Sequence, residues 1–314
     1  MAGALDLPAG EAGLALAPGA RVHILPAVAG YVGADAVADA LAAALDEPGL
    51  PRLLLDLGTN AEMILSAGER LWACAAAAGP AFEGARISCG MRAAPGAIDR
   101  VAIADGRVQV RTLGEEPPLG LAGSGLVSAA AALRRQGLVS ARGRFQPAAA
   151  PALFATGKNG PEFLLVPAAE SGHGRPIVLS QKDIAELLLA KAAIAAGMEV
   201  LLEEAGLETG DLSQVYIAGS FGSYVDREEA MEIGLVPLLP PDAVRSIGNA
   251  AGAGAVLALL SLEMRQRAWE LARRIRYIEL SARADFNARF VREMAFPHLP
   301  AGNPSFAPGA KYPP

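Results

Sequence analysis

Three stretches of the chain run from apolar residues directly into a glycine-bearing turn, and they constrain the fold more than any other feature. They lie at residues 53–60, 122–125 and 217–222. A turn of this kind exposes main-chain N–H groups, and glycine leaves them free of side-chain obstruction, so a phosphate can approach. The order predicts an α/β fold in which the three turns meet along one edge of a sheet.

The pattern of apolar residues predicts a meander of three strands followed by alternating helices and strands. An Asp105-Gly106 pair between apolar runs predicts a further hairpin, and Ser180 with Asp183 predicts a capping box at a helix start. The expected strands are residues 22–25, 53–57, 61–66, 70–75, 101–103, 108–110, 215–218, 244–247 and 277–280. The expected helices are residues 35–45, 126–136, 181–205, 226–233, 263–274 and 285–294, with a further helix after residue 254.

Breaks in composition divide the chain into three parts. Glu47-Pro48-Gly49-Leu50-Pro51 interrupts the first helical pattern and predicts a boundary near residue 51. Residues 52–296 then form the main domain, and residues 297–314, rich in Pro and Gly, are expected to be a tail.

Composition excludes several classes of protein. Of the 314 residues, 52% are hydrophobic, so the chain can form a core and is not disordered. The net charge of -6 and the pI of about 5.3 give no reason to expect nucleic acid as a partner. Two cysteines cannot supply the four ligands of an iron–sulfur cluster, and the three scattered histidines show no zinc-ligand spacing. Any metal is therefore expected to be a hard cation such as Mg²⁺, carried by a nucleotide.

The mean hydropathy of +0.31 calls for a test of a membrane location. The longest uncharged apolar stretch, residues 250–262, is shorter than the roughly 20 residues that a transmembrane helix needs. The first residues also lack a basic segment before their weak apolar stretch, so no signal peptide is predicted. We therefore expect a cytoplasmic protein without a membrane partner.

The turn after the first strand of the meander is the most informative candidate site. Gly58 allows close approach of a phosphate, and Thr59 and Asn60 can donate hydrogen bonds to its oxygens. Asp56, at the end of the strand, can hold magnesium through water. The alternative is an ordinary polar hairpin turn, because Asp, Gly, Thr and Asn are all common in turns.

The second candidate is the start of the predicted helix at residue 126. Gly123, Ser124 and Gly125 offer an anion site at the positive end of the helix dipole. The alternative is that Ser124 simply caps the helix.

The third candidate follows the strand at residues 215–218. Gly219, Ser220, Phe221 and Gly222 form a turn against which a base and ribose can lie. The alternative is a tight connection from strand to helix.

The sequence does not decide the role of four further residues. Cys74 and Cys89 are interpreted as a small buried residue and a loop thiol. Glu62, on the strand after Asp56, and Glu83, in a glycine-containing loop, are candidates for functional carboxylates.

The order of these motifs resembles the actin-like ATPase superfamily, which shares a ribonuclease H-like fold. The turn Asp56–Asn60 is similar to its second phosphate motif, and residues 217–222 are similar to its adenosine motif. Longer strings, at residues 78–84, 89–98 and 247–255, resemble the C-terminal ATPase domain of reductive activators of corrinoid proteins. So do residues 277–281 and 285–287.

The resemblance implies an activity. Members of this family use ATP and Mg²⁺ to return inactive cob(II)alamin to cob(I)alamin in the corrinoid protein of a methyltransferase system. A [2Fe–2S] ferredoxin-like domain supplies the electron, and the family is dimeric. On this basis Asp56 organises magnesium, and Gly58, Thr59 and Asn60 bind phosphates. Residues 123–125 support the phosphate or ribose side, and residues 219–222 receive adenosine.

The sequence departs from the family plan in two ways. It lacks the four cysteines of the ferredoxin domain, and it lacks a first phosphate motif, Asp-Ile-Gly-Thr-Thr. Residues 1–51 are therefore expected to be a linker or the remnant of a preceding lobe, and the [2Fe–2S] cluster is expected on a missing domain or a separate chain. Whether the chain alone is an enzyme stays open. The alternatives are a small-molecule kinase of the same superfamily and a non-catalytic lobe that docks on the corrinoid protein.

Overall fold

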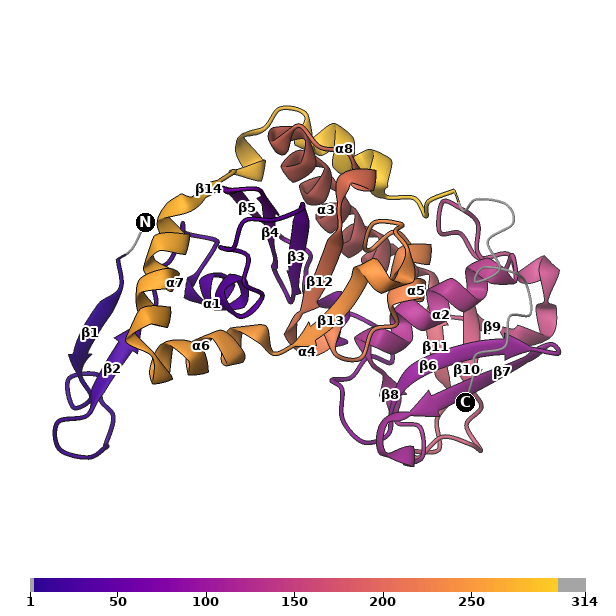
Figure 1. The fold of residues 1–314 in the computed structure, drawn as a ribbon. Helices are drawn as coiled ribbons and strands as arrows, with labels where there is room; N and C mark the ends of the chain where they lie inside the picture. Colours follow the sequence, from indigo (N-terminus) through magenta and orange to yellow (C-terminus); the bar gives the residue numbers. More distant parts are fainter. Residues whose placement is uncertain (1–2, 299–314) are drawn as a thin grey trace.

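A six-stranded mixed sheet forms the centre of the computed structural model, which describes residues 3–298 (Figure 1). The strands lie in the order β13-β12-β3-β4-β5-β14. Their bounds are β3 (Arg52–Leu57), β4 (Ala61–Ala67), β5 (Arg70–Ala76), β12 (Gln214–Ala218), β13 (Val244–Gly248) and β14 (Ile275–Tyr277).

The topology confirms the predicted fold class. Strands β3, β4 and β5 form the expected antiparallel meander, while β12 pairs in parallel with β3 and with β13. A meander extended by parallel strands next to its first strand is the order of a ribonuclease H-like, actin-like sheet. Because side chains alternate along a strand, Leu53, Leu55 and Leu57 of β3 enter one hydrophobic core and Leu54 enters the other.

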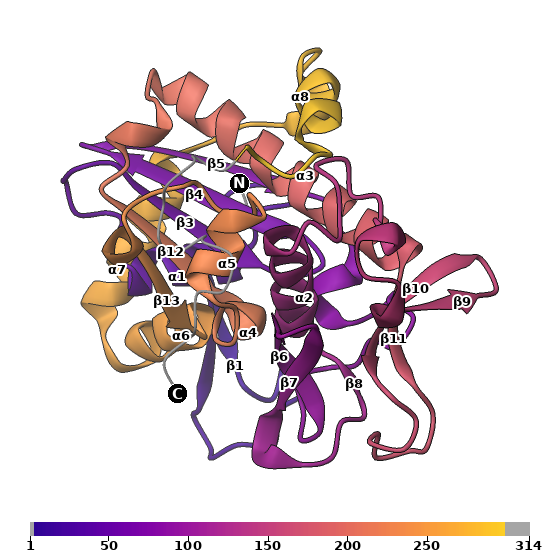
Figure 2. The same cartoon turned by 90° about the vertical axis from the view of Figure 1, so that its right-hand side faces the viewer.

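Helices cover both faces of this sheet (Figures 1 and 2). The long helix α3 (Gln181–Ala205) packs on β4 and β5, and it begins with the predicted Ser180–Asp183 capping box. The other face is covered by α1 (Ala34–Ala42) and α7 (Leu262–Arg274), and α6 (Ala250–Leu260) packs on these two helices. A Cβ on Gly254 of α6 would lie 2.0 Å from the carbonyl oxygen of Ala38, so glycine allows α6 to touch the backbone of α1.

The residues between β5 and α3 form a second part of the molecule, to the right in Figure 1. The helix α2 (Gly123–Arg135) lies beside two small sheets. One contains β6 (Ala97–Ala104), β7 (Arg107–Thr112) and β8 (Gly120–Leu121), and the other contains β9 (Phe154–Gly157), β10 (Gly160–Val166) and β11 (Ile177–Ser180). The predicted hairpin is confirmed: Asp105 and Gly106 have φ values of 51° and 69°, which a type I′ turn requires.

The N-terminal part contains one expected and one unexpected strand. The strand predicted at residues 22–25 is β2 (Arg21–Ile24), and it pairs with β1 (Leu5–Pro8), which the sequence did not indicate. The helix α1 contributes buried residues to the core under β3 and β4. The division of the chain near residue 51 stays a prediction.

The C-terminal part corrects one expected strand. Residues 277–280 were expected to be a strand, but β14 ends at Tyr277, and Leu280 begins a short 3₁₀ turn. The Glu279 side chain accepts a hydrogen bond from the N–H of Ser281, which favours the turn over an extended chain. Helix α8 (Phe286–Glu293) follows, and residues 299–314 of the predicted tail lie outside the described residues. No helix in the described part of the chain is both long and apolar enough to cross a bilayer.

Candidate functional site

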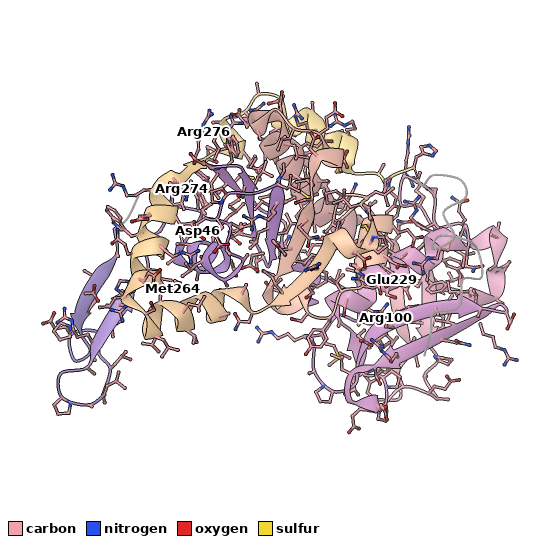
Figure 3. The ribbon with its side chains drawn as sticks, viewed as in Figure 1. Asp46, Arg100, Glu229, Met264, Arg274 and Arg276 are labelled. Carbon is pink, nitrogen blue, oxygen red and sulfur yellow. The ribbon has the colours of Figure 1, made fainter. Side chains whose placement is uncertain are left out.

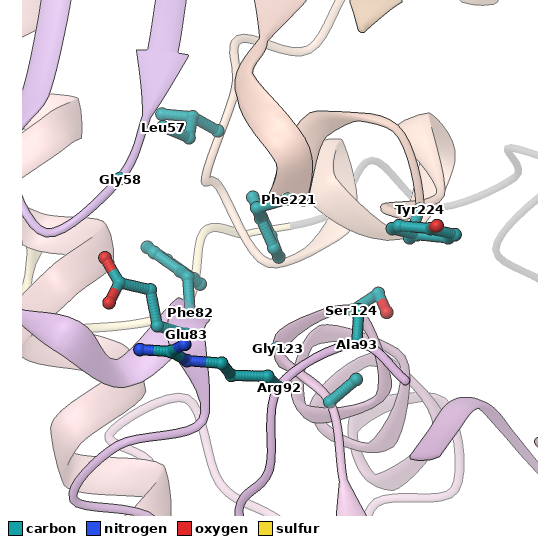
Figure 4. Close-up of a pocket in the computed structure, with 11 residues that line it drawn as sticks. Leu57, Gly58, Phe82, Glu83, Arg92, Ala93, Gly123, Ser124, Phe221 and Tyr224 are labelled. Atoms are coloured by element: carbon teal, nitrogen blue, oxygen red, sulfur yellow. The ribbon is translucent and has the colours of Figure 1, made fainter. Parts of the chain in front are cut away.

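A cavity of about 470 Å³ lies where β3, α2 and the segment after β12 meet (Figure 4). A volume of this size is typical of small-molecule sites. Its walls come from parts of the chain that are far apart in sequence. The lining residues are Leu57, Gly58, Phe82, Glu83, Arg92, Ala93, Ala122, Gly123, Ser124, Phe221 and Tyr224.

The first wall is the N-terminus of α2. The helix begins at Gly123, three residues earlier than expected, and its N-cap is Ala122, which provides no side-chain hydrogen bond. The alternative prediction, that Ser124 caps the helix, is therefore wrong. Ser124 is only 4% exposed, and its hydroxyl has no hydrogen-bond partner among the described residues. The uncapped N–H groups and the buried hydroxyl are hydrogen-bond donors without an acceptor, so a ligand with acceptor oxygens could bind here.

The two glycines of this helix start are explained by packing. A Cβ on Gly123 would lie 1.9 Å from the carbonyl oxygen of Phe82, and one on Gly125 would lie 2.1 Å from that of Ile98. Glycine therefore lets α2 press against the 3₁₀ turn Pro80–Glu83 and against β6. Gly123 also lines the cavity, whereas Gly125 is not among its lining residues.

The second wall follows β12. Phe221 lies in a short helical turn, α4 (Gly219–Gly222), and its ring packs on that of Phe82 with centroids 4.7 Å apart and planes tilted by 32°. Gly219 has a φ of +87°, and a Cβ there would lie 2.5 Å from Oδ1 of Asp56. A Cβ on Gly222 would lie 2.8 Å from Cγ2 of Ile217, and Gly222 is not among the lining residues. The side chain of Ser220 lies outside the described part of the structure.

The turn after β3 supplies less to the cavity than expected. Gly58 lines it, but the N–H of Gly58 donates to the carbonyl oxygen of Asn60 at 3.0 Å. The hydroxyl of Thr59 donates to Glu83, which lines the cavity. Asn60 is exposed and is not among the lining residues.

Asp56 is not among the cavity's lining residues. It alternates with the core-facing leucines of β3, on the side of the sheet that α1 covers. It interacts there with Asp39 of α1, a carboxyl group that the sequence analysis missed and that is 1% exposed. Burial, then the neighbouring charge of Asp56, raises the pKa of Asp39 to about 8. Burial followed by Asp56 likewise raises the pKa of Glu62 to about 7, and burial raises that of Asp56.

These carboxyl groups do not by themselves form a metal site. No group of three or more His, Cys, Asp or Glu side chains within residues 3–298 has a geometry that could hold a metal ion. Asp56 supplies the hard oxygen donors that Mg²⁺ prefers. It therefore suits an ion whose other ligands are water molecules and the phosphate oxygens of a nucleotide. The chain's two cysteines do not fit an iron–sulfur cluster, which needs four ligands, and Cys74 is fully buried.

Two charged residues in the cavity give it its polarity. Glu83 comes from the 3₁₀ turn Pro80–Glu83, and Arg92 comes from the loop that leads to β6 (Figure 4). Sequence reasoning named Glu83 as a candidate but missed Arg92, Phe82 and Tyr224. Phe82 and Arg92 belong to strings that were quoted for the family resemblance without a chemical role.

A network of charged side chains connects the walls, and Figure 3 labels two of its members, Arg100 and Glu229. Arg100 of β6 donates to Asp226, the N-cap of α5 (Arg227–Glu232), at 2.7 Å. The hydroxyl of Ser128 in α2 donates to Glu229 of α5 at 3.0 Å. Because α5 directly follows Phe221 and Tyr224, this network fixes the second wall against the first.

The fold and the cavity together define an actin-like (ASKHA) domain, and comparisons with known proteins place it in a family. The chain belongs to the RACo family. Residues 51–305 match the family model of the C-terminal ASKHA domain of RACo, and residues 1–48 match that of the RACo middle region.

Three relatives support this assignment. The corrinoid activation enzyme RamQ of Eubacterium limosum is 37% identical over 300 residues, which are 93% of this chain and 50% of RamQ. The [Co(II) methylated amine-specific corrinoid protein] reductase of Methanosarcina barkeri is 29% identical over 300 residues, 88% of this chain and 52% of that protein. A solved structure of a reductive activator for corrinoid,iron-sulfur protein has a TM-score of 0.87 at 39% identity, covering 93% of this chain and 47% of that one. The chain thus spans about half the length of these relatives.

Proposed function

We propose that this chain is the ATP-binding part of a reductive activator that supports the reduction of cob(II)alamin to cob(I)alamin in a corrinoid protein. The family and the names of the relatives support corrinoid activation. One observation carries the assignment of ATP. Gly58, the uncapped start of α2 with its buried, unpartnered Ser124, and the aromatic wall of Phe221 line the same cavity.

The cavity offers different chemistry on its two sides. The start of α2 provides N–H groups, the positive end of a helix dipole and the Ser124 hydroxyl, all suited to phosphate oxygens. Phe82, Phe221 and Tyr224 provide aromatic surface for a base. Asp56 would hold Mg²⁺ through water at the end of β3. When bound, the ion would neutralise charge on the phosphates.

The electron donor belongs elsewhere in this proposal. Because the two cysteines do not fit a [2Fe–2S] cluster, the electron comes from a ferredoxin-like domain or a separate chain. The corrinoid protein is the partner that receives it. That the activator works as a homodimer and that the chain acts in the cytoplasm stay predictions.

Calorimetric titration with Mg-ATP tests the nucleotide assignment. We expect saturable heat with the wild-type chain, weaker binding with Asp56→Ala, and little binding without Mg²⁺, because the carboxyl groups of Asp39 and Glu62 lie near Asp56. No heat at millimolar Mg-ATP would instead favour a lobe that docks on the corrinoid protein without binding nucleotide. Phosphoryl transfer to a sugar or an acyl acid would favour a kinase.

A further inference from the structure

We infer that Arg92 is a phosphate-binding residue that holds the polyphosphate of the ligand in the cavity. This inference rests on the proposed function, and it adds a contact between Arg92 and the phosphates to it. Among the described residues that line the cavity, Arg92 carries the one basic side chain. It forms no hydrogen bond or ion pair with any residue in the described part of the chain, so its guanidinium is available to a ligand.

The loop that carries Arg92 is held rigidly at the start of α2. The N–H of Met91 donates to the carbonyl oxygen of Leu121 at 3.0 Å, and the N–H of Leu121 donates to that of Cys89 at 2.7 Å. A Cβ on Gly90 would lie 2.0 Å from the carbonyl oxygen of Gly84, so the loop is packed backbone to backbone. These contacts place Arg92 one residue after an anchored position.

These contacts fix the backbone from which the side chain extends. In Figure 4 the Arg92 side chain extends toward the side of the cavity where Gly58 and Glu83 lie. Glu83 is itself fixed, because it accepts a hydrogen bond from the hydroxyl of Thr59. Arg92 and the start of α2, with Ser124, line the same cavity from two elements.

This arrangement matches the chemistry of a phosphate chain. A guanidinium presents a planar fork of donors that pairs with two phosphate oxygens, and its charge is permanent. The N–H groups of α2 and the Ser124 hydroxyl donate to neighbouring oxygens. Since Glu83 lies in the same cavity, the positive charge of Arg92 also offsets a carboxylate that would otherwise repel the ligand.

The test uses calorimetry of the full chain with Mg-ATP, Mg-ADP, adenosine and magnesium tripolyphosphate. We expect Arg92→Gln to weaken Mg-ATP binding about ten- to a hundredfold, as loss of a charge-assisted contact does, and to leave adenosine binding unchanged. Arg92→Lys should recover part of the loss, because it restores the charge but not the fork. The matched control is Arg86→Gln, an exposed arginine of the same loop that does not line the cavity.

Several outcomes would overturn the inference. They are unchanged Mg-ATP affinity in Arg92→Gln, equal weakening for Mg-ATP and adenosine, or an equal loss in Arg86→Gln. The proposed function can fail separately. If tripolyphosphate binds in an Arg92-dependent way but neither ATP nor adenosine binds, Arg92 holds a polyphosphate and the assignment of a nucleotide is wrong. A wild-type chain that binds none of the four probes overturns both.

Discussion

At the scale of the residue, Ser124 shows that the cavity is built at a cost in stability. Its hydroxyl is buried and has no partner in the described part of the chain, whereas Ser128, one turn later in α2, bonds to Val101 and Glu229. A buried polar group without a partner typically destabilises the folded state by about 1–3 kcal/mol. Such a group is expected where a ligand completes the hydrogen bonding.

The substitution Ser124→Ala should therefore stabilise the free protein, by about 1 kcal/mol, and reduce the stabilisation that Mg-ATP provides. Thermal unfolding with and without Mg-ATP measures both effects. Ser128→Ala is the control and should destabilise the protein, because it breaks hydrogen bonds that already exist. A destabilised Ser124→Ala protein would contradict the role given to this hydroxyl.

The glycine at the start of α2 should not tolerate a methyl group. In Gly123→Ala the new Cβ would overlap the carbonyl oxygen of Phe82, so α2 and the 3₁₀ turn must separate. We expect a loss of about 1–3 kcal/mol in urea unfolding and weaker nucleotide binding. Gly210→Ala, where nothing lies within 4 Å of the added atom, is the control and should change little.

Single residues could be predicted only where their chemistry is local. Gly58, Gly123, Ser124 and Phe221 lie next to strand or helix ends that the sequence shows, and the structure brings these four to one cavity. Arg92 sits in a loop without periodicity, so its direction depends on long-range contacts to β8. Contact between Asp39 and Asp56 likewise depends on how α1 crosses the sheet.

At the scale of the element, α2 and α5 meet through buried charges. Arg135 of α2 pairs with Glu232 of α5 at 2.5 Å, and the Glu232 side chain is fully buried. Burial raises the pKa of Glu232 to about 7, against the opposing effect of Arg135. The contact that supports the Phe221 wall therefore responds to pH near neutrality.

This response has a definite sign. The pKa of Glu232 is higher in the folded protein, about 7, than its ordinary value of 4.5, so the folded state binds the proton more tightly. Its contribution to stability is complete below pH 4.5 and is lost as the pH rises through about 7. The loss is at most about 1.4 kcal/mol per pH unit within that window.

Urea unfolding at about pH 5 and about pH 8 tests the prediction. Glu232→Gln should lose less stability over this range than the wild type, because its amide does not titrate. Glu116→Gln, at an exposed position, should keep the wild-type dependence. Parallel losses in Glu232→Gln and the wild type would show that this carboxyl group does not titrate in the window.

Elements were predictable when a turn or cap marked them. The meander of β3 to β5, the Asp105-Gly106 hairpin and α3 with its capping box all carry such signals. The sheet of β9 to β11 does not: β10 begins with Gly160 and Pro161, which argue against a strand. Its strands are specified by packing against α3 and the phenylalanine rings of residues 145, 154 and 163.

At the scale of the whole molecule, an apolar face of α6 and the start of α7 lies uncovered. Val256, Leu259, Leu260 and Leu262 are between 52% and 78% exposed. A group of large apolar side chains this exposed promotes association. The relatives, about half of whose length this chain spans, contain further polypeptide in addition to the part matched here.

The isolated chain should therefore associate as its concentration rises. The double substitution Leu259→Glu with Leu260→Glu should reduce this association without lowering the melting temperature, since both side chains are exposed. Sedimentation velocity over a range of concentrations measures the effect. Leu16→Glu, an exposed leucine outside α6, is the control, and equal loss of association there would exclude α6 as the contact.

The cavity draws its walls from residues 57–58, 82–93, 122–124 and 221–224, so more than half of the chain must be in place before it exists. Binding of a fluorescent nucleotide analogue would then measure the fraction of molecules that are completely folded. Refolding followed by that signal would report the formation of the complete cavity.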